Sequence, residues 1–425
     1  MNAIELIELP FRPFRTACSV PTDLESVSER GDEVPARELG LDAVAVDKVW
    51  GRIEALYRTG LYPAVQVCIR RHGAVALEGA LGHAAGNAPD DPPEGPKTRA
   101  GIRTPFTIYS ASKAITAMVI HKLDEQGLIR LDDRVCDYIP EFGVHGKERI
   151  TIRHVLGHRA GIPNLPSEAL DLALLESPAA VNRLLCDSRP TSVPGRRLAY
   201  HAISGGFVLA ELAERVTGHD IREILTKEIR EPLGFRWMNY GVDPADVSRV
   251  ALNAFTGFPP IPPFSGLLER ALGVDLHRAV ELSNDPRFLT GIIPSANIVA
   301  TANELSAFYQ CLLDEGEYQG VRVFDPRTIH RATLEQTFLE IDLTLGLPLP
   351  YGLGFMLGGW PIGLFGPDTP HAFGHLGFTN ILSWADPERE IAVALITSGK
   401  PFLSPEVIRL VQVIAEIARA FPKVS

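Results

Sequence analysis

Ser110-Ala-Ser-Lys113 opens a strong helical pattern and follows a loop rich in proline and glycine. The apolar positions of that pattern recur at helical spacing, at Ile115, Met118, Val119 and Leu123. Residues three apart on a helix share a face, so we expect the Ser110 hydroxyl and the Lys113 amine to approach each other. No other Ser-x-x-Lys occurs in the chain, which makes this stretch the starting point for the rest.

A serine beside a lysine supports nucleophilic chemistry only if the lysine is neutral. A free serine hydroxyl is a poor nucleophile and needs a base within hydrogen-bond reach. The reference pKa of lysine, about 10.4, leaves the amine protonated at neutral pH, so the pair requires a buried lysine. The start of a helix also offers unpaired backbone N–H groups to the negative oxygen of a tetrahedral intermediate. Taken alone, the motif fits a nucleophilic serine and an ordinary solvated helix face equally well.

A tyrosine far along the chain stands at the start of a second helical pattern. Tyr200-His-Ala202 follows Pro194-Gly195 and opens the apolar pattern of residues 202–216. A phenol beside a lysine can pass a proton toward the nucleophile in one step and toward the leaving group in another. The alternative is a core aromatic residue with its hydroxyl hydrogen-bonded, the commoner fate of a single tyrosine.

The third motif is His375-Leu-Gly377, which lies just before Phe378 and a predicted strand. Glycine at this place lets an edge strand come close to a ligand. The backbone N–H of Phe378 then becomes a candidate for a second oxyanion donor. Taken without the other motifs, the stretch favours a tight turn into a strand.

Segments that predict strands lie toward both ends of the chain and enclose a helical middle. A helix over about 44–57 precedes strands at 64–69 and 74–77, which flank Arg71-His-Gly73 as a hairpin. Later segments predict strands at 351–355, 380–384 and 391–396, and a closing helix at 407–420. The pattern predicts an α/β (α+β) fold, an antiparallel sheet flanked by helices with an all-α insertion. We expect an N-terminal extension at 1–42, sheet regions at about 43–105 and 290–425, and a helical region at about 106–289.

The composition is that of a soluble globular protein, with 45% hydrophobic and 22% charged residues among 425. A net charge of −11 without a Lys/Arg cluster argues against nucleic acid as a partner. Five cysteines without a Cys-x-x-Cys pair predict reduced thiols, not a disulfide framework or zinc site. No stretch approaches the ~20 apolar residues of a membrane span, and Glu5, Glu8 and Pro10 are atypical of a signal peptide, so we expect a cytoplasmic protein.

Together, the three motifs resemble those of the serine β-lactamase and penicillin-binding protein superfamily, which combines Ser-x-x-Lys, a middle Tyr or Ser motif, and Lys-Thr-Gly. The likeness covers residue 43 to the end and is greatest to class C β-lactamases and family VIII carboxylesterases. Thr151–Gly161, Tyr351-Gly-Leu-Gly-Phe355 and Ala385-Asp-Pro-Glu-Arg389 are similar as well. The resemblance implies a β-lactamase/transpeptidase-like fold and a serine hydrolase.

The resemblance also implies a role for each motif residue. Ser110 would be the nucleophile, Lys113 the base and Tyr200 the proton relay. The backbone N–H groups of Ser110 and Phe378 would form the oxyanion hole. Neither a metal ion nor an organic cofactor is implied.

Two positions depart from the class C pattern. Ala202 stands where class C enzymes have the Asn of Tyr-x-Asn, so no amide is available to hold a β-lactam side chain. His375 replaces the lysine of Lys-Thr-Gly, and a mostly neutral imidazole binds anions more weakly. With Gly377, these two residues are expected to bind substrate. We therefore expect a carboxylesterase that acts on a small-molecule ester through an acyl-enzyme on Ser110.

Several alternatives stay open on these residues. The protein could be a β-lactamase or D-Ala-D-Ala peptidase, an acyltransferase, or a catalytically silent binding or scaffolding homologue. Ser204 lies in a loosened nucleophile-elbow pattern, but no convincing strand precedes it. His154 and His158 have a zinc-like spacing, but no Glu follows His154 and no third ligand is evident. We expect neither a Ser204 nucleophile nor a metal site.

Overall fold

The computed structural model describes residues 16–424 apart from 166–171, 176, 261, 263–264, 267–268, 270–273 and 403–405. Residues 1–15 of the predicted N-terminal extension therefore lie outside the described residues. The part of the extension that is described contributes one short strand, β1, to the edge of the main sheet.

An eight-stranded antiparallel sheet forms the centre of the fold. Its strands follow the order β1-β3-β2-β15-β14-β13-β10, with β4 paired to β3. They are β1 (Ser28–Arg30), β2 (Ala64–Arg71), β3 (Ala74–Ala85), β4 (Thr98–Arg99), β10 (Met356–Leu357), β13 (Phe373–Gly377), β14 (Ile381–Asp386) and β15 (Ile391–Thr397). The pairing of β2 with β15 sets Val67 opposite Leu395, so segments from the two ends of the chain meet at the middle of the sheet.

The predicted first hairpin is confirmed. His72 and Gly73 connect β2 to β3 and have positive φ values of 50° and 81°. A two-residue turn with both central residues in this region matches the right-handed twist of the flanking strands. The strand β3 runs on to Ala85, well past its predicted end at residue 77.

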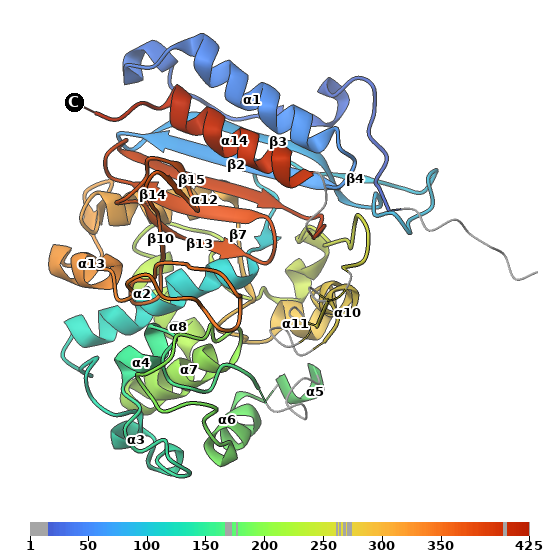
Figure 1. The fold of residues 1–425 in the computed structure, drawn as a ribbon. Coiled ribbons are helices and arrows are strands. Elements are labelled where there is room, and N and C mark those ends of the chain that lie inside the picture. Colours follow the sequence, from blue (N-terminus) through green and yellow to red (C-terminus); the bar gives the residue numbers. More distant parts are fainter. Residues whose placement is uncertain are drawn as a thin grey trace, which may run out of the picture.

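Helices cover both faces of the sheet, as the predicted fold class requires. On one face, α1 (Ala43–Tyr57) and α14 (Glu406–Ala420) lie side by side (Figure 1). On the other face, α12 (Ala302–Leu313) packs against β2, β14 and β15. Every residue of β2 and β15 is consequently buried, and one hydrophobic core lies on each side of the sheet.

The helical region lies beneath the sheet in Figure 1. Its helices are α2 (Ser112–Glu125), α3 (Val135–Tyr138), α4 (Ile152–Leu156), α5 (Leu172–Leu175), α6 (Pro178–Asp187), α7 (Ser204–Thr217), α8 (Ile221–Leu225), α10 (Leu276–Leu282) and α11 (Pro286–Thr290). A small sheet of β5 (Phe106–Thr107), β7 (Ile298–Ala300) and β6 (Asn239–Tyr240) joins this region to the rest. The remaining elements are α13 (Pro326–Thr333) and the hairpins β8–β9 (Glu317–Tyr318, Val321–Arg322) and β11–β12 (Ile362–Gly363, Gly366–Pro367).

One predicted strand is wrong, and one strand was not predicted. The segment 351–355 is not a strand, because Gly354 has a φ of 100° and Tyr351 forms only an isolated bridge with Met356. The motif His375-Leu-Gly377 does precede the predicted strand, which is β14, but it also forms the end of β13, a strand that the sequence did not predict. It therefore lies inside the sheet, one strand from the edge strand β10.

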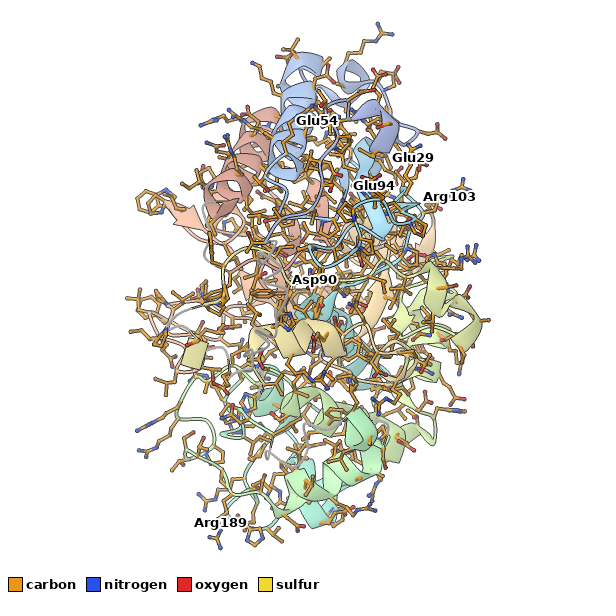
Figure 2. All side chains as sticks on the ribbon, turned by 90° about the vertical axis from the view of Figure 1, so that its right-hand side faces the viewer. Glu29, Glu54, Asp90, Glu94, Arg103 and Arg189 are labelled. Atoms are coloured by element: carbon orange, nitrogen blue, oxygen red, sulfur yellow. The ribbon has the colours of Figure 1, made fainter. Side chains whose placement is uncertain are left out.

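Within the described part of the chain, no helix has both the length and the apolar character needed to cross a membrane. All five cysteines are free thiols, and four of them are buried. Charged side chains are distributed over the whole molecule. Figure 2 shows Glu54 of α1 toward one end and Arg189 at the opposite end.

Candidate active site

The nucleophile candidate and its base are in hydrogen-bond contact. Ser110 lies in a 3₁₀ turn (Tyr109–Ala111) that leads directly into α2. The Nζ of Lys113 lies one helical turn on and donates to the Ser110 Oγ at 2.9 Å and to the Ser295 carbonyl oxygen at 3.1 Å. Lys113 is buried, with 8% of the residue exposed, and Ser110 is half-buried. This geometry rules out a solvated helix face for Lys113.

The surroundings of Lys113 favour its neutral form. Burial lowers the pKa of Lys113 well below its ordinary value. Burial likewise lowers the pKa of His201 and of His375 to about 3, and the positive charge of Lys113 contributes in the same direction. His158 is a third buried histidine whose pKa is lowered, first by burial and then by these neighbours. The amine is thus surrounded by neutral rings and is suited to take up a proton.

Tyr200 lies against the same pair of residues. Its ring centroid is 4.9 Å from the Lys113 Nζ, and only 5% of the residue is exposed. Burial raises the pKa of the Tyr200 phenol, and its hydrogen bond with Ser110 offsets that shift only in part. The phenol therefore stays protonated at neutral pH and can hold or pass a proton between Ser110, Lys113 and a leaving group.

A buried carboxylate behind Tyr200 holds it in place, and no sequence motif predicted it. The Asp342 Oδ1 accepts from the backbone N–H of Tyr200 at 3.1 Å, and its Oδ2 accepts from the Tyr351 hydroxyl at 3.0 Å. The N–H groups of Thr344 and Leu345 also donate to Oδ1, at 2.8 and 3.0 Å. Asp342 is completely buried, and four donors satisfy its oxygens. Apart from Tyr200, only Tyr351 among these residues belongs to a stretch that resembles the family.

His375 reaches the site from β13. Its ring centroid lies 6.2 Å from that of Tyr200, and the residue is 1% exposed. The Nδ1 donates to the Leu376 carbonyl oxygen at 2.6 Å. A neutral ring with its proton on Nδ1 has a bare Nε2, which is a hydrogen-bond acceptor. Where the family pattern has a lysine, this site therefore has a neutral acceptor and no cation.

Gly377 brings the end of β13 against the nucleophile. A Cβ on Gly377 would lie 2.3 Å from the Ile108 carbonyl oxygen, so only glycine permits this approach. The next residue, Phe378, has a φ of 52°, and its ring centroid lies 4.7 Å from that of Tyr109. Tyr109, beside Ser110, has a φ of 48°. Two left-handed residues thus face each other across the site, a conformation that persists only when the surrounding structure enforces it.

A small cavity of about 100 Å³ opens beside Ser110. Ala202 and Phe378 line it, as do mostly apolar residues of the helical region: Leu165, Leu172, Ile203, Val274, Ala279, Leu282, Phe288, Ile293 and Ala296, with Tyr109. None of the described residues that line this cavity carries a charge. It suits an uncharged, apolar group attached to the atom that Ser110 attacks.

The discounted residues have other contacts. Ser204 donates to the Ile162 carbonyl oxygen at 2.5 Å, and the Nδ1 of His154 accepts from the Thr151 N–H at 3.2 Å. The Nδ1 of His158 accepts from the His201 N–H at 3.2 Å. Among the residues that the structure describes, no group of three or more His, Cys, Asp or Glu side chains could hold a metal ion.

Comparison with known proteins supports the same interpretation. The profile of the beta-lactamase family matches residues 51–416. The esterase/beta-lactamase LipL of Mycobacterium tuberculosis is 33% identical over 306 residues, which cover 68% of each chain. The crystal structure of a family VIII carboxylesterase superposes with a TM-score of 0.74 at 26% identity, over 88% of this chain and 98% of that one. A penicillin-binding protein homologue from Caulobacter crescentus gives the same TM-score and identity, over 92% and 100%.

The sheet with helices on both faces, the Ser-x-x-Lys pair at the start of α2 and the match over residues 51–416 agree with one another. The chain belongs to the beta-lactamase family.

Proposed function

We propose that the protein is a serine hydrolase that cleaves uncharged carboxylic esters through an acyl-enzyme on Ser110. The observation that carries this proposal is the 2.9 Å contact between the Ser110 Oγ and the Nζ of a lysine whose pKa burial has lowered. A base with a lowered pKa beside a serine is what acyl transfer at neutral pH requires.

In the first half-reaction, the Ser110 Oγ attacks the carbonyl carbon of the ester and its proton passes to Lys113. The N–H groups of Ser110 and Phe378 would receive the oxyanion. As the carbon–oxygen bond of the ester breaks, the Tyr200 hydroxyl gives its proton to the leaving alkoxide and is reprotonated by Lys113. An alcohol leaves, and the acyl group stays on Ser110.

In the second half-reaction, a water molecule attacks the acyl carbon and its proton passes through the Tyr200 hydroxyl to Lys113. The bond to the Ser110 Oγ breaks, Lys113 returns the proton to that oxygen, and a carboxylic acid is released. An alcohol in place of water would complete an acyl transfer by the same steps. The geometry therefore accommodates acyl transfer as a side reaction.

The charges of the site favour esters over β-lactams and D-Ala-D-Ala peptides. Those substrates carry a carboxylate, which the family binds with the lysine of Lys-Thr-Gly. Here a buried, neutral His375 with a bare Nε2 stands at that position. Ala202 offers no amide, and the cavity beside Ser110 is lined without charge. A hydrogen-bond acceptor at this position would repel the carboxylate of such a substrate, whereas an uncharged ester avoids that repulsion.

Turnover of p-nitrophenyl butyrate and of a chromogenic cephalosporin, measured on the same preparation, tests the proposal. We expect ester hydrolysis to be much the faster, and a fluorophosphonate probe to label the wild type but not Ser110→Ala. Faster cephalosporin turnover would make the protein a β-lactamase. Absence of both labelling and turnover would make it a silent homologue.

A further inference from the structure

Exposed hydrophobic side chains are concentrated in one part of the chain. Of the nineteen exposed large hydrophobic residues in the described part of the chain, eight lie between positions 334 and 362. We call this set the apolar face: Leu334, Phe338, Leu339, Ile341, Leu343, Leu347, Trp360 and Ile362. Three of them are almost entirely in solvent, Phe338 at 79%, Leu339 at 87% and Trp360 at 76% exposure. Scattered apolar residues on a surface are ordinary, but a cluster of this kind marks an interaction site.

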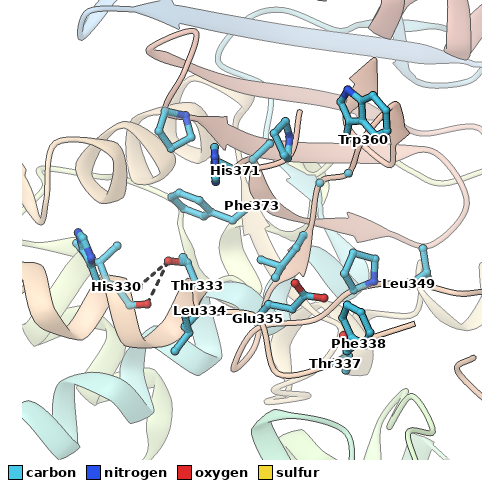
Figure 3. Close-up of a pocket in the computed structure, with 18 of the residues that line it drawn as sticks. His330, Thr333, Leu334, Glu335, Thr337, Phe338, Leu349, Trp360, His371 and Phe373 are labelled. Atoms are coloured by element: carbon cyan, nitrogen blue, oxygen red, sulfur yellow. Dashed lines mark hydrogen bonds between the residues drawn. The ribbon is translucent and has the colours of Figure 1, made fainter. Parts of the chain in front are cut away.

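Four residues of the apolar face lie at a cavity of about 840 Å³ that is separate from the one beside Ser110. Leu334, Phe338, Leu339 and Trp360 line it, and Figure 3 shows Leu334 and Phe338 on its lower side and Trp360 above. Most of these side chains belong to loops, between α13 and β10 and at the start of the β11–β12 hairpin. They can therefore enter an apolar phase without disturbing the sheet.

This part of the molecule carries almost no free charge. No lysine or arginine occurs between Arg331 and Arg389. Of the nearby acidic groups, Glu340 is paired with Arg159, and Asp368 is paired with Lys423 at 2.9 Å. Glu315 and Glu335 are the other acidic residues among those described at the cavity wall. A segment without basic residues, on a chain of net charge −11, has little attraction for anionic lipid or nucleic acid.

The kinds of apolar residue in the face, mostly aliphatic, favour a lipid surface over a protein partner. Protein interfaces are enriched in Tyr, Arg and Trp and contain about one hydrogen bond per 100–200 Å². The apolar face consists instead of six leucine and isoleucine residues, one phenylalanine and one tryptophan. Aliphatic side chains gain most by entering hydrocarbon, and tryptophan favours the boundary between lipid and water.

The loop that bears the apolar face also touches the active site. Ile341 and Leu343, 60% and 56% exposed, flank the fully buried Asp342. Asp342 accepts from the Tyr200 N–H, and the Leu343 N–H donates to the Leu198 carbonyl oxygen at 3.0 Å. One loop therefore has an outer side in solvent and an inner side against the residue that relays protons. A surface that binds the outer side of this loop therefore lies near the active site, where the molecules of that surface would react.

From these observations we propose that the apolar face docks the protein onto the surface of aggregated, uncharged ester lipid. The proposal rests on the ester hydrolysis proposed above, and it names the physical form of the substrate. Docking buries the exposed side chains in the aggregate, and the esters of that aggregate then supply the active site.

The test compares binding and hydrolysis in a matched set of variants of the full chain. Phe338→Ser/Trp360→Ser removes the two aromatic anchors. Val44→Ser/Val193→Ser removes two valines that are 60% and 63% exposed elsewhere, and serves as control. Binding is measured by co-sedimentation with trioctanoin emulsion droplets, phosphatidylcholine vesicles and phosphatidylglycerol vesicles. We expect the aromatic double variant to bind droplets at least about tenfold more weakly than either wild type or control.

Hydrolysis of soluble p-nitrophenyl butyrate is measured in parallel and should be the same in all three proteins. Wild type that hydrolyses the soluble ester but does not bind droplets overturns the docking proposal alone. Wild type that binds droplets but hydrolyses no ester overturns the proposed function and leaves docking supported. Stronger binding to phosphatidylglycerol than to uncharged lipid contradicts the charge argument. A dimer that the aromatic double variant converts to monomer, with droplet binding unchanged, assigns the apolar face to a second copy of the chain.

Discussion

Gly377 and Ile108 lie so close together that a Cβ on the glycine would stand 2.3 Å from the Ile108 carbonyl oxygen. Ile108 is two residues before Ser110, and Gly377 is one residue before Phe378. The contact therefore fixes the end of β13 against the turn that carries the nucleophile. It thereby sets the relative position of the two N–H groups that we propose as the oxyanion hole, which come from segments far apart in the chain.

Gly377→Ala should separate these segments and misplace the Phe378 N–H. We expect kcat/KM for p-nitrophenyl butyrate to fall by about 10²-fold, as it does when an oxyanion donor is lost. Gly51→Ala is the matched control, because Gly51 is exposed on α1 and a Cβ there meets nothing within 4 Å. That control should retain full activity and a Tm at least equal to the wild type. Wild-type rates in Gly377→Ala would show that this close approach does not matter to catalysis.

Lys113→Ala should lower kcat by about 10³-fold or more while the protein stays folded, because the base and its contact with Ser110 are lost. Tyr200→Phe should be less severe, since Lys113 remains to activate the serine. Lys48→Ala, an exposed lysine on α1, is the control and should be silent. Steady-state kinetics with circular dichroism separates loss of chemistry from loss of fold. A Lys113→Ala enzyme of normal rate would disprove the role given to the lysine.

The lowered pKa of Lys113 and the raised pKa of Tyr200 each predict one feature of how kcat/KM depends on pH. The base must be unprotonated, so kcat/KM should rise with pH through that lowered pKa and then stay level. The raised pKa of Tyr200 keeps the phenol protonated, so no decline is expected below about pH 10, its ordinary value. A rate that starts to rise only near pH 10, as for an ordinary lysine, would contradict this account.

The same shift affects stability. The unfolded chain holds the Lys113 proton up to about pH 10.4, whereas the folded protein releases it at lower pH. Between those two values the unfolded state binds more protons, so this residue makes stability rise with pH. Lys113→Met removes that dependence. The variant should therefore have a higher Tm than the wild type, and the difference should be largest at acid pH. Thermal melts from about pH 5 to about pH 10 measure it, and parallel Tm curves for the two proteins would contradict it.

Asp342→Asn tests whether the buried carboxylate positions Tyr200. The amide keeps one acceptor oxygen but places donors near the N–H or hydroxyl groups that now bond to Asp342. We expect kcat to fall about 10–100-fold with little change in KM, and stability to fall by about 1–3 kcal/mol. In a Tyr200→Phe background the same change should cost little further activity, because the two residues act as a unit. Full additivity of the two effects would reduce Asp342 to a structural residue, and Tyr351→Phe isolates the contribution of the other hydrogen bond.

The local features of this molecule could be predicted from sequence. Helical spacing identifies α2, the pair Ser110 and Lys113 follows from three residues of separation, and His72-Gly73 marks a hairpin turn. Tyr200 and His375 were found through their motifs and their resemblance to a family. Their distances to Lys113 and to each other depend on tertiary packing that no short pattern encodes.

Asp342 shows why the rest could not be predicted. It lies in Leu339-Glu-Ile-Asp-Leu343, an alternation typical of a strand with apolar residues inside. In the structure the two sides are the other way round: Ile341 and Leu343 are exposed and the aspartate is buried. Its burial is repaid by the N–H of Tyr200, 142 residues away, and by the Tyr351 hydroxyl. A pattern confined to neighbouring residues does not contain that partner.

The groups proposed for catalysis come from both layers of the molecule: Ser110 from the turn before α2, Lys113 from α2, Tyr200 from the helical region and Phe378 from the position that follows β13 of the sheet. Activity therefore reports the alignment of these layers more sensitively than any spectroscopic signal of helix or strand content. A shift of the helical region relative to the sheet by about an ångström would leave every element intact and still silence the protein. Heat, denaturant or a distant substitution that loosens the contact between the helical region and the sheet should abolish turnover before the chain unfolds.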